Sequence, residues 1–187
     1  TGDSVEALKA FVRGIDAVNE WVGRTVAWLT LGCVVTCFAV VVLRYLFDLG
    51  FPWLQELYVW QHAAVFMAGA GYTMLHGGHV NVDVLYGRFG ARGRAWVDIL
   101  GTLVFLFPWL AVVALTSAPF VTSSWSIREA SNTANGMPAV YLVKSLLWVF
   151  CALLFMQGLA LIARRGLYLA GRGTTGHDED RRTDERR

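Results

Sequence analysis

Two histidines and an aspartate stand close together in the stretch GYTMLHGGHVNVD, residues 71–83, and their side chains could bind a metal. His76, His79 and Asp83 are residue types that ligate zinc, and either histidine could also be an axial ligand of haem. A Gly-Gly pair separates the histidines, however, and glycine at this place is typical of a helix end. The stretch therefore fits a metal site, a haem ligand or the polar end of a helix.

The other candidate ligands argue against a cofactor. A zinc site uses three or four protein ligands, whereas this stretch offers two histidines and one aspartate with no cysteine nearby. A haem in a helical bundle is held from facing helices, but His62, His76 and His79 all belong to one predicted helix or its end. We therefore expect no catalytic residue, no metal and no cofactor in this chain, and we favour the helix-end interpretation.

The segments around this stretch are strongly apolar. Of the 187 residues, 56% are hydrophobic, which exceeds the share in an ordinary soluble domain. Residues 25–43, 57–82, 99–127 and 145–163 contain no Asp, Glu, Lys or Arg, and the shortest of these runs has 19 residues. A helix of that length crosses roughly 30 Å of hydrocarbon. The sequence predicts an all-α integral membrane protein whose four transmembrane helices, at about 28–46, 53–75, 96–118 and 139–163, form one domain over 25–165.

Polar segments flank the predicted transmembrane domain. Residues 1–24 show apolar positions at helical spacing with charges on the other side, which predicts an amphipathic arm on the cytoplasmic side. Either this arm is an interfacial helix joined to the first span, or it is the first part of one long helix. Residues 166–187 are predicted to be a disordered, charged tail. Pro108 is expected to kink the third helix, which should leave the membrane near Pro119.

The basic residues are distributed unevenly among the connections. Thirteen of the sixteen Lys and Arg residues lie before the first predicted span, between the second and third, or after the fourth. The remaining three are Arg44, Arg128 and Lys144. Because loops rich in Lys and Arg stay on the cytoplasmic side, both termini and the middle connection are predicted to be cytoplasmic.

Few residues could carry a transport or catalytic reaction. An ion-coupled path needs an acidic group within the hydrocarbon, and the only candidate, Glu56, lies about one turn inside the outer end of the second span. Arg44 ends the first span on the same side, so the two are expected to form an interfacial salt bridge or to contact a partner. The chain has no nucleotide-binding loop, no nucleophile motif and no basic nucleic-acid surface. These features indicate an accessory or anchor subunit rather than an enzyme.

Three stretches together resemble a known family. The first, RYLFDLGFPWLQELYVWQHAAVFMAGAGYTMLHGGHVNVDVL, and the second, REASNTANGMPAVYL, are followed by a Leu-rich fourth span that contains Gln157. Their order and spacing are similar to those of the small membrane subunit of TRAP (tripartite ATP-independent periplasmic) transporters, the DctQ family, over nearly all of residues 25–165. The matching positions, which the resemblance makes family-motif or partner-interface candidates, are Arg44, Trp53, Glu56, His79, Asp83, Glu129, Ser131, Gly136 and Pro138.

This resemblance implies a location, two protein partners and a role. The chain would lie in the bacterial inner membrane beside a large multi-pass subunit, with a periplasmic solute-binding protein as the second partner. The assembly would use a sodium gradient to import a solute, typically an organic acid, and sodium would bind the large subunit. The small subunit would be a non-catalytic scaffold. The alternative from another class is the membrane anchor of a quinone-linked oxidoreductase.

The resemblance also bears on the opening stretch. HGGHVNVD would be a structural signature at the inner end of the second span, where His79 and Asp83 orient backbone or meet a partner. His76 lies outside the matched motif, and its replacement is expected to have little effect.

Overall fold

The structure, a computed structural model, describes residues 2–78 and 89–171, and every regular element in these ranges is a helix. In chain order they are α1 (Gly2–Leu46), α2 (Pro52–Leu75), α4 (Ala91–Gly101), the π-helix η1 (Thr102–Leu106), α5 (Phe107–Ser126) and α6 (Val140–Leu169). The elements α4, η1 and α5 follow one another without a break. The predicted all-α class is confirmed.

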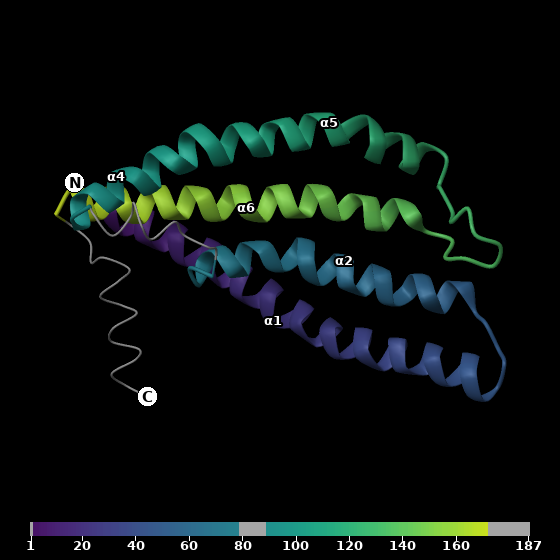
Figure 1. The fold of residues 1–187 in the computed structure, drawn as a ribbon. Coiled ribbons are helices and arrows are strands. Elements are labelled where there is room, and N and C mark those ends of the chain that lie inside the picture. The colour runs from purple at the N-terminus through teal and green to yellow at the C-terminus, as the bar shows by residue number, and fades with distance from the viewer. Residues whose placement is uncertain (1, 79–88, 172–187) are drawn as a thin grey trace.

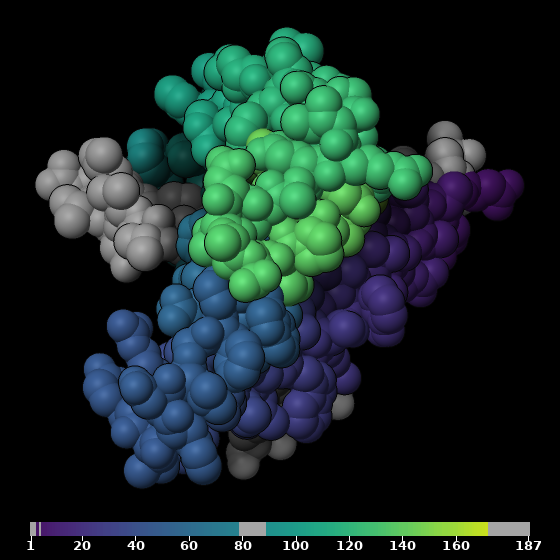
Figure 2. Space-filling view, turned by 90° about the vertical axis from the view of Figure 1, so that its right-hand side faces the viewer, coloured from purple at the N-terminus to yellow at the C-terminus, as the bar shows by residue number. Residues whose placement is uncertain are grey.

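The long helices lie largely in a row (Figure 1). Helix α6 packs between α5 and α2, and α2 packs between α6 and α1. Connections 47–51 and 127–139 lie at one end of the row, which we call the loop end, and α6 finishes at the opposite end, which we call the tail end. Figure 2 looks onto the loop end, where the α5–α6 connection lies beside the start of α2.

Three helical segments are long and apolar enough to cross a membrane. They are Val5–Leu46, Ala91–Ser126 and Val140–Leu169. Helix α2 has 24 residues, a sufficient length, but Glu56, Gln61 and His62 make it more polar than the other three. The count of four spans therefore stays a prediction.

Helix α1 is continuous over 45 residues, so the predicted arm and the first predicted span form one helix. This is the second of the two alternatives that the sequence leaves open. The apolar residues of the arm divide between two environments: Val12 and Ile15 are buried against Ala160 of α6, whereas Phe11 and Val18 remain exposed. Packing against α6 therefore holds part of the arm's apolar face within the protein.

The two prolines of the third apolar segment, Pro108 and Pro119, have different effects on its helix. The π-helix η1 lies directly before Pro108, the second residue of α5. Because proline lacks an amide hydrogen and its ring crowds the preceding turn, a wider π-turn accommodates it. The kink expected at Pro108 thus takes the form of a π-helix directly before the proline. Pro119 lies inside α5, which continues to Ser126, and the exit from the membrane near Pro119 stays a prediction.

The last helix extends further than the sequence pattern indicated. Helix α6 continues to Leu169, and Gly171 follows it with a φ of +70°, a conformation that suits glycine after a helix. Residues 166–169, which the prediction assigned to the tail, thus belong to α6, where Leu167, Tyr168 and Leu169 are partly buried. The rest of the predicted tail lies outside the described residues.

Candidate functional site

The HGG part of the opening stretch forms a helix end. Helix α2 finishes at Leu75, and Gly77 has a φ of +64°. The amide of Gly77 donates to the carbonyl of Met74 at 3.2 Å, and the amide of Gly78 donates to that of Thr73 at 2.8 Å. These two hydrogen bonds define a Schellman motif, in which glycine adopts the left-handed conformation with little strain. The helix-end interpretation is confirmed here, while His79 and Asp83 lie outside the described residues.

His76 contacts α1. Its Nε2 lies 2.8 Å from Oε2 of Glu20, and its ring lies against Tyr72 with 4.3 Å between the ring centroids. Glu20 also pairs with Arg24 at 2.9 Å. Within residues 2–78 and 89–171, no three His, Cys, Asp or Glu side chains gather as a metal site requires. His76 therefore connects the end of α2 to α1, a role that its position outside the matched motif did not reveal.

Four residues from distant parts of the chain meet at the loop end, and we call Glu56, Ser131, Gly136 and Met137 the loop-end cluster. Glu56 projects from the second turn of α2 into the α5–α6 connection. Its Oε1 accepts a hydrogen bond from the Ser131 hydroxyl, and its Oε2 accepts one from the Met137 amide at 2.7 Å. One carboxylate thus fixes both sides of the connection to the start of α2.

The connection is folded tightly around this carboxylate. The amide of Ser131 donates to the carbonyl of Met137 at 2.9 Å, which closes the segment between them. A Cβ on Gly136 would lie 2.6 Å from the Ser131 hydroxyl oxygen and 2.8 Å from Glu56 Oε1. Any side chain at Gly136 would therefore collide with both groups. Pro138 follows directly and favours an extended conformation at Met137.

Glu129 performs a related task at the start of α6. Its carbonyl accepts a hydrogen bond from the amide of Val140 at 3.0 Å, and its carboxylate accepts one from Lys144. The Lys144 ammonium also lies over the ring of Phe120, 3.9 Å from its centroid. Because this ammonium donates to the carboxylate, the pKa of Glu129 is lowered from its ordinary value. The pair joins the end of α5 to the first turns of α6.

Two of the sequence candidates at the loop end take no part in these contacts. Arg44 is exposed at the end of α1 and has no hydrogen-bond or ion-pair partner among the described residues. The salt bridge expected between Arg44 and Glu56 is therefore wrong, because Ser131 and Met137 occupy the carboxylate. Trp53 is 43% exposed, and its ring lies 6.4 Å from that of Phe51. Both side chains remain available to a partner.

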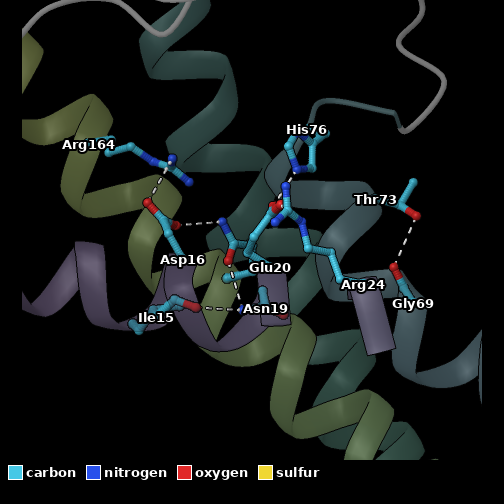
Figure 3. Close-up of polar contacts among 10 residues, drawn as sticks. Ile15, Asp16, Asn19, Glu20, Arg24, Gly69, Thr73, His76 and Arg164 are labelled. Carbon is cyan, nitrogen blue, oxygen red and sulfur yellow. Dashed lines mark hydrogen bonds and ion pairs between the residues drawn. The ribbon is translucent and has the colours of Figure 1, made fainter. Parts of the chain in front are cut away.

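A second group of polar side chains lies toward the tail end, and we call Asp16, Asn19, Gln157 and Arg164 the tail-end cluster (Figure 3). The Asn19 amide nitrogen donates to Gln157 Oε1 at 2.9 Å, and Gln157 Nε2 donates to Asp16 Oδ1 at 3.2 Å. Arg164 donates to the other oxygen of Asp16 at 3.3 Å. Asn19 and Gln157 are 1% and 0% exposed. These hydrogen bonds join the first third of α1 to α6.

The same cluster brings in α2. The side-chain oxygen of Asn19 is buried and has no hydrogen-bond partner among the described residues, and a Cβ on Gly71 would lie 1.9 Å from it. Gly71 therefore permits α1 and α2 to approach closely at this oxygen. Three helices meet at Asn19. Its short, polar side chain fits there only because Gly71 has no side chain.

Sequence reasoning missed most of the tail-end cluster. It noted Gln157 only as part of the resemblance, and it gave Asp16, Asn19 and Arg164 no contact between helices. A further ion pair joins Arg165 of α6 to Asp98 of α4 at 2.7 Å. One available signal was the pair Arg164-Arg165 at the end of an apolar helix, since adjacent cations there require counter-charges from neighbouring helices.

The polar contacts of the two clusters position helices and connections rather than reacting groups. The two clusters bond elements that are distant in the sequence, and a hollow of about 260 Å³ lies open at the loop end beside Glu56, Val59 and Thr133. It does not resemble an enclosed substrate pocket, which buries most of its ligand. The geometry supports attachment and positioning.

Comparison with known proteins agrees with this picture. The chain matches the family model described as "Tripartite ATP-independent periplasmic transporters, DctQ component" over residues 32–166. This range contains the whole loop-end cluster and the α6 residues of the tail-end cluster, and it begins after Asp16 and Asn19. No curated protein and no solved structure matches the chain significantly.

Proposed function

Because the chain belongs to the DctQ family, the small membrane component of TRAP transporters, we propose that it is a non-catalytic scaffold for the transporter's large membrane subunit. Its place is the inner membrane. The assembly would import a solute, in this proposal an organic acid, using a sodium gradient and a periplasmic solute-binding protein. Sodium and solute would bind the large subunit.

The open row of helices is the observation that supports the scaffold role best. Apart from the contact of α1 with α6 toward the tail end, much of the surface of the long helices stays uncovered, and large apolar residues such as Phe38 of α1 and Phe105 of η1 are 69% and 75% exposed. The buried amides of Asn19 and Gln157 are hydrogen-bonded to each other and so join α1 to α6. A layer of this kind is better suited to widening a neighbouring membrane protein than to enclosing a transport path of its own.

The proposed orientation places the tail end in the cytoplasm and the loop end in the periplasm. Arg164, Arg165 and the basic residues of the first turns of α1 support it, because cytoplasmic ends of membrane helices are rich in Lys and Arg. Thr133→Cys at the loop end and Gly171→Cys at the tail end test it. An impermeant thiol reagent should label only Thr133→Cys in intact cells; labelling of Gly171→Cys alone would reverse the orientation.

The decisive experiment is purification of the tagged chain from native membranes in a mild detergent, with identification of all co-purifying proteins by mass. A multi-pass partner of about twelve spans is the expected result. A partner that carries flavin or haem, visible in the absorbance spectrum, would instead indicate an oxidoreductase anchor and contradict the proposal.

A further inference from the structure

Helix α2 has one face that no other described helix covers. Its exposed residues at helical spacing include Val59, His62 and Phe66, and Gly69 lies one turn further along the same face. Val59 is 53% exposed and Phe66 is 67% exposed. The hollow at the loop end opens beside Val59, so this face continues into a surface that is already recessed.

His62 distinguishes this face from the other exposed faces. It is the eleventh of the 24 residues of α2, which places it near the middle of the helix. Within the described part of the chain it has no hydrogen-bond or ion-pair partner. An imidazole facing hydrocarbon leaves its polar nitrogens unsatisfied, which is costly in a membrane.

Gly69 provides a separate argument that another helix packs on this face. A Cβ at Gly69 would meet nothing within 4 Å, so packing inside this chain does not require a glycine there. Glycine in the interior of a helix weakens it relative to alanine. In membrane proteins small residues allow another helix to come close, and such a neighbour would account for both Gly69 and His62.

The exposed residues of η1 and α5 provide the contrast. Leu103 and Phe105 of η1 and Val112 and Leu115 of α5 are all more than half exposed and all apolar, so lipid chains satisfy them fully. On α2, lipid would leave His62 unpaired, whereas a helix with a hydrogen-bonding side chain or a free carbonyl would not.

We propose that the α2 face formed by Val59, His62, Phe66 and Gly69 is the docking surface for a transmembrane helix of the large partner subunit, and that this helix presents a hydrogen-bonding group to His62. The inference rests on the proposed function, since it takes the partner from there. Beyond the proposed function, the inference specifies which side of the row of helices the partner covers.

The test is photo-crosslinking in native membranes, with a matched control. The photoreactive amino acid benzoyl-phenylalanine replaces Phe66 on α2 or Phe105 on η1, so both changes exchange one exposed phenylalanine for a larger one. Position 66 should form an adduct with the large subunit, and position 105 should form adducts with lipid. Lipid adducts alone at position 66, in a preparation that still contains the complex, would overturn the inference.

Substitutions of the polar and small residues provide a second measurement. His62→Leu should lower recovery of the complex by roughly three- to tenfold, the range of one interhelical hydrogen bond in a membrane, while His62→Gln retains most of it. Gly69→Leu should also weaken the complex, although the isolated chain stays as stable as before. An undiminished complex in both His62→Leu and Gly69→Leu would contradict the docking surface. Absence of any large partner from the wild-type preparation would instead contradict the proposed function itself.

Discussion

At the scale of single residues, Gly136 is the position where the smallest change should have a clear effect. Gly136→Ala places a methyl group within 3 Å of both the Ser131 hydroxyl and the Glu56 carboxylate, so the connection must move or lose a hydrogen bond. We expect a loss of about 1–3 kcal/mol in the free energy of unfolding, the usual cost of overpacking. Titration with a denaturing detergent measures it.

Gly50 is the matched control for Gly136. It lies in the other connection at the loop end, and a Cβ there would meet nothing within 4 Å. Gly50→Ala should therefore leave stability nearly unchanged. Equal losses in the two variants would show that the crowding around Gly136 has no energetic consequence.

Glu129 makes the α5–α6 connection sensitive to acid. Because Lys144 lowers the pKa of Glu129 in the folded protein, the ionised carboxylate stabilises the fold at any pH above its ordinary pKa of about 4.3. This contribution is lost as the pH falls through the lower, folded pKa. Hydrogen exchange of residues 127–140, corrected for the intrinsic rate, should stay slow from pH 8 to 5 and increase below about pH 4.

The variant Glu129→Gln shows whether this carboxylate is the cause. It cannot ionise, so exchange in the connection should already be faster at neutral pH and should change less between pH 5 and 4. An acid response as large as that of the wild type would assign the titration to another group.

At the scale of helices, the sequence predicts local ends well and long-range contacts poorly. Pro52 and Gly77 set the ends of α2 through their own backbone preferences, so the residues themselves carry the signal. Glu56 and Ser131 are 75 residues apart, and Asn19 and Gln157 are 138 apart. Each of these residues is compatible with many partners, and only the packing of the row selects one. The continuity of α1 was likewise undecided, since an amphipathic turn suits a membrane surface and α6 equally.

Gly77 tests the local part of this reasoning. Gly77→Ala forces a side chain into a φ of +64°, which should cost about 1 kcal/mol in the free energy of unfolding. Gly166→Ala is the control, because Gly166 lies inside α6 with open space at its Cβ. That change should be neutral or stabilise by up to about 1 kcal/mol, since alanine favours helix. A destabilised Gly166→Ala together with an unaffected Gly77→Ala would contradict the Schellman motif as the end of α2.

At the scale of the whole molecule, the tail-end cluster decides whether α1 stays attached to the row over its full length. Gln157→Leu removes the acceptor of the Asn19 amide and the donor to Asp16 together. We expect a loss of about 1–3 kcal/mol, the cost of leaving buried polar groups unpaired. Hydrogen exchange should rise in residues 12–20 of α1, whereas α5, which takes no part in the hydrogen bonds of the cluster, should keep its protection.

The double variant Gln157→Leu with Asn19→Ala separates this network from simple loss of packing. If the two amides act through their shared hydrogen bond, the second change adds less than its separate effect, with a coupling of about 0.5–2 kcal/mol. Strictly additive losses would mean that the hydrogen bond between the two amides adds nothing to the other contacts of α1 with α6, such as the packing of Val12 and Ile15 on Ala160. Coupling would mean that α1, α2 and α6 are joined at one polar point, because Asn19 reaches both Gln157 and Gly71. The arm would then move with the row as one body when a partner binds.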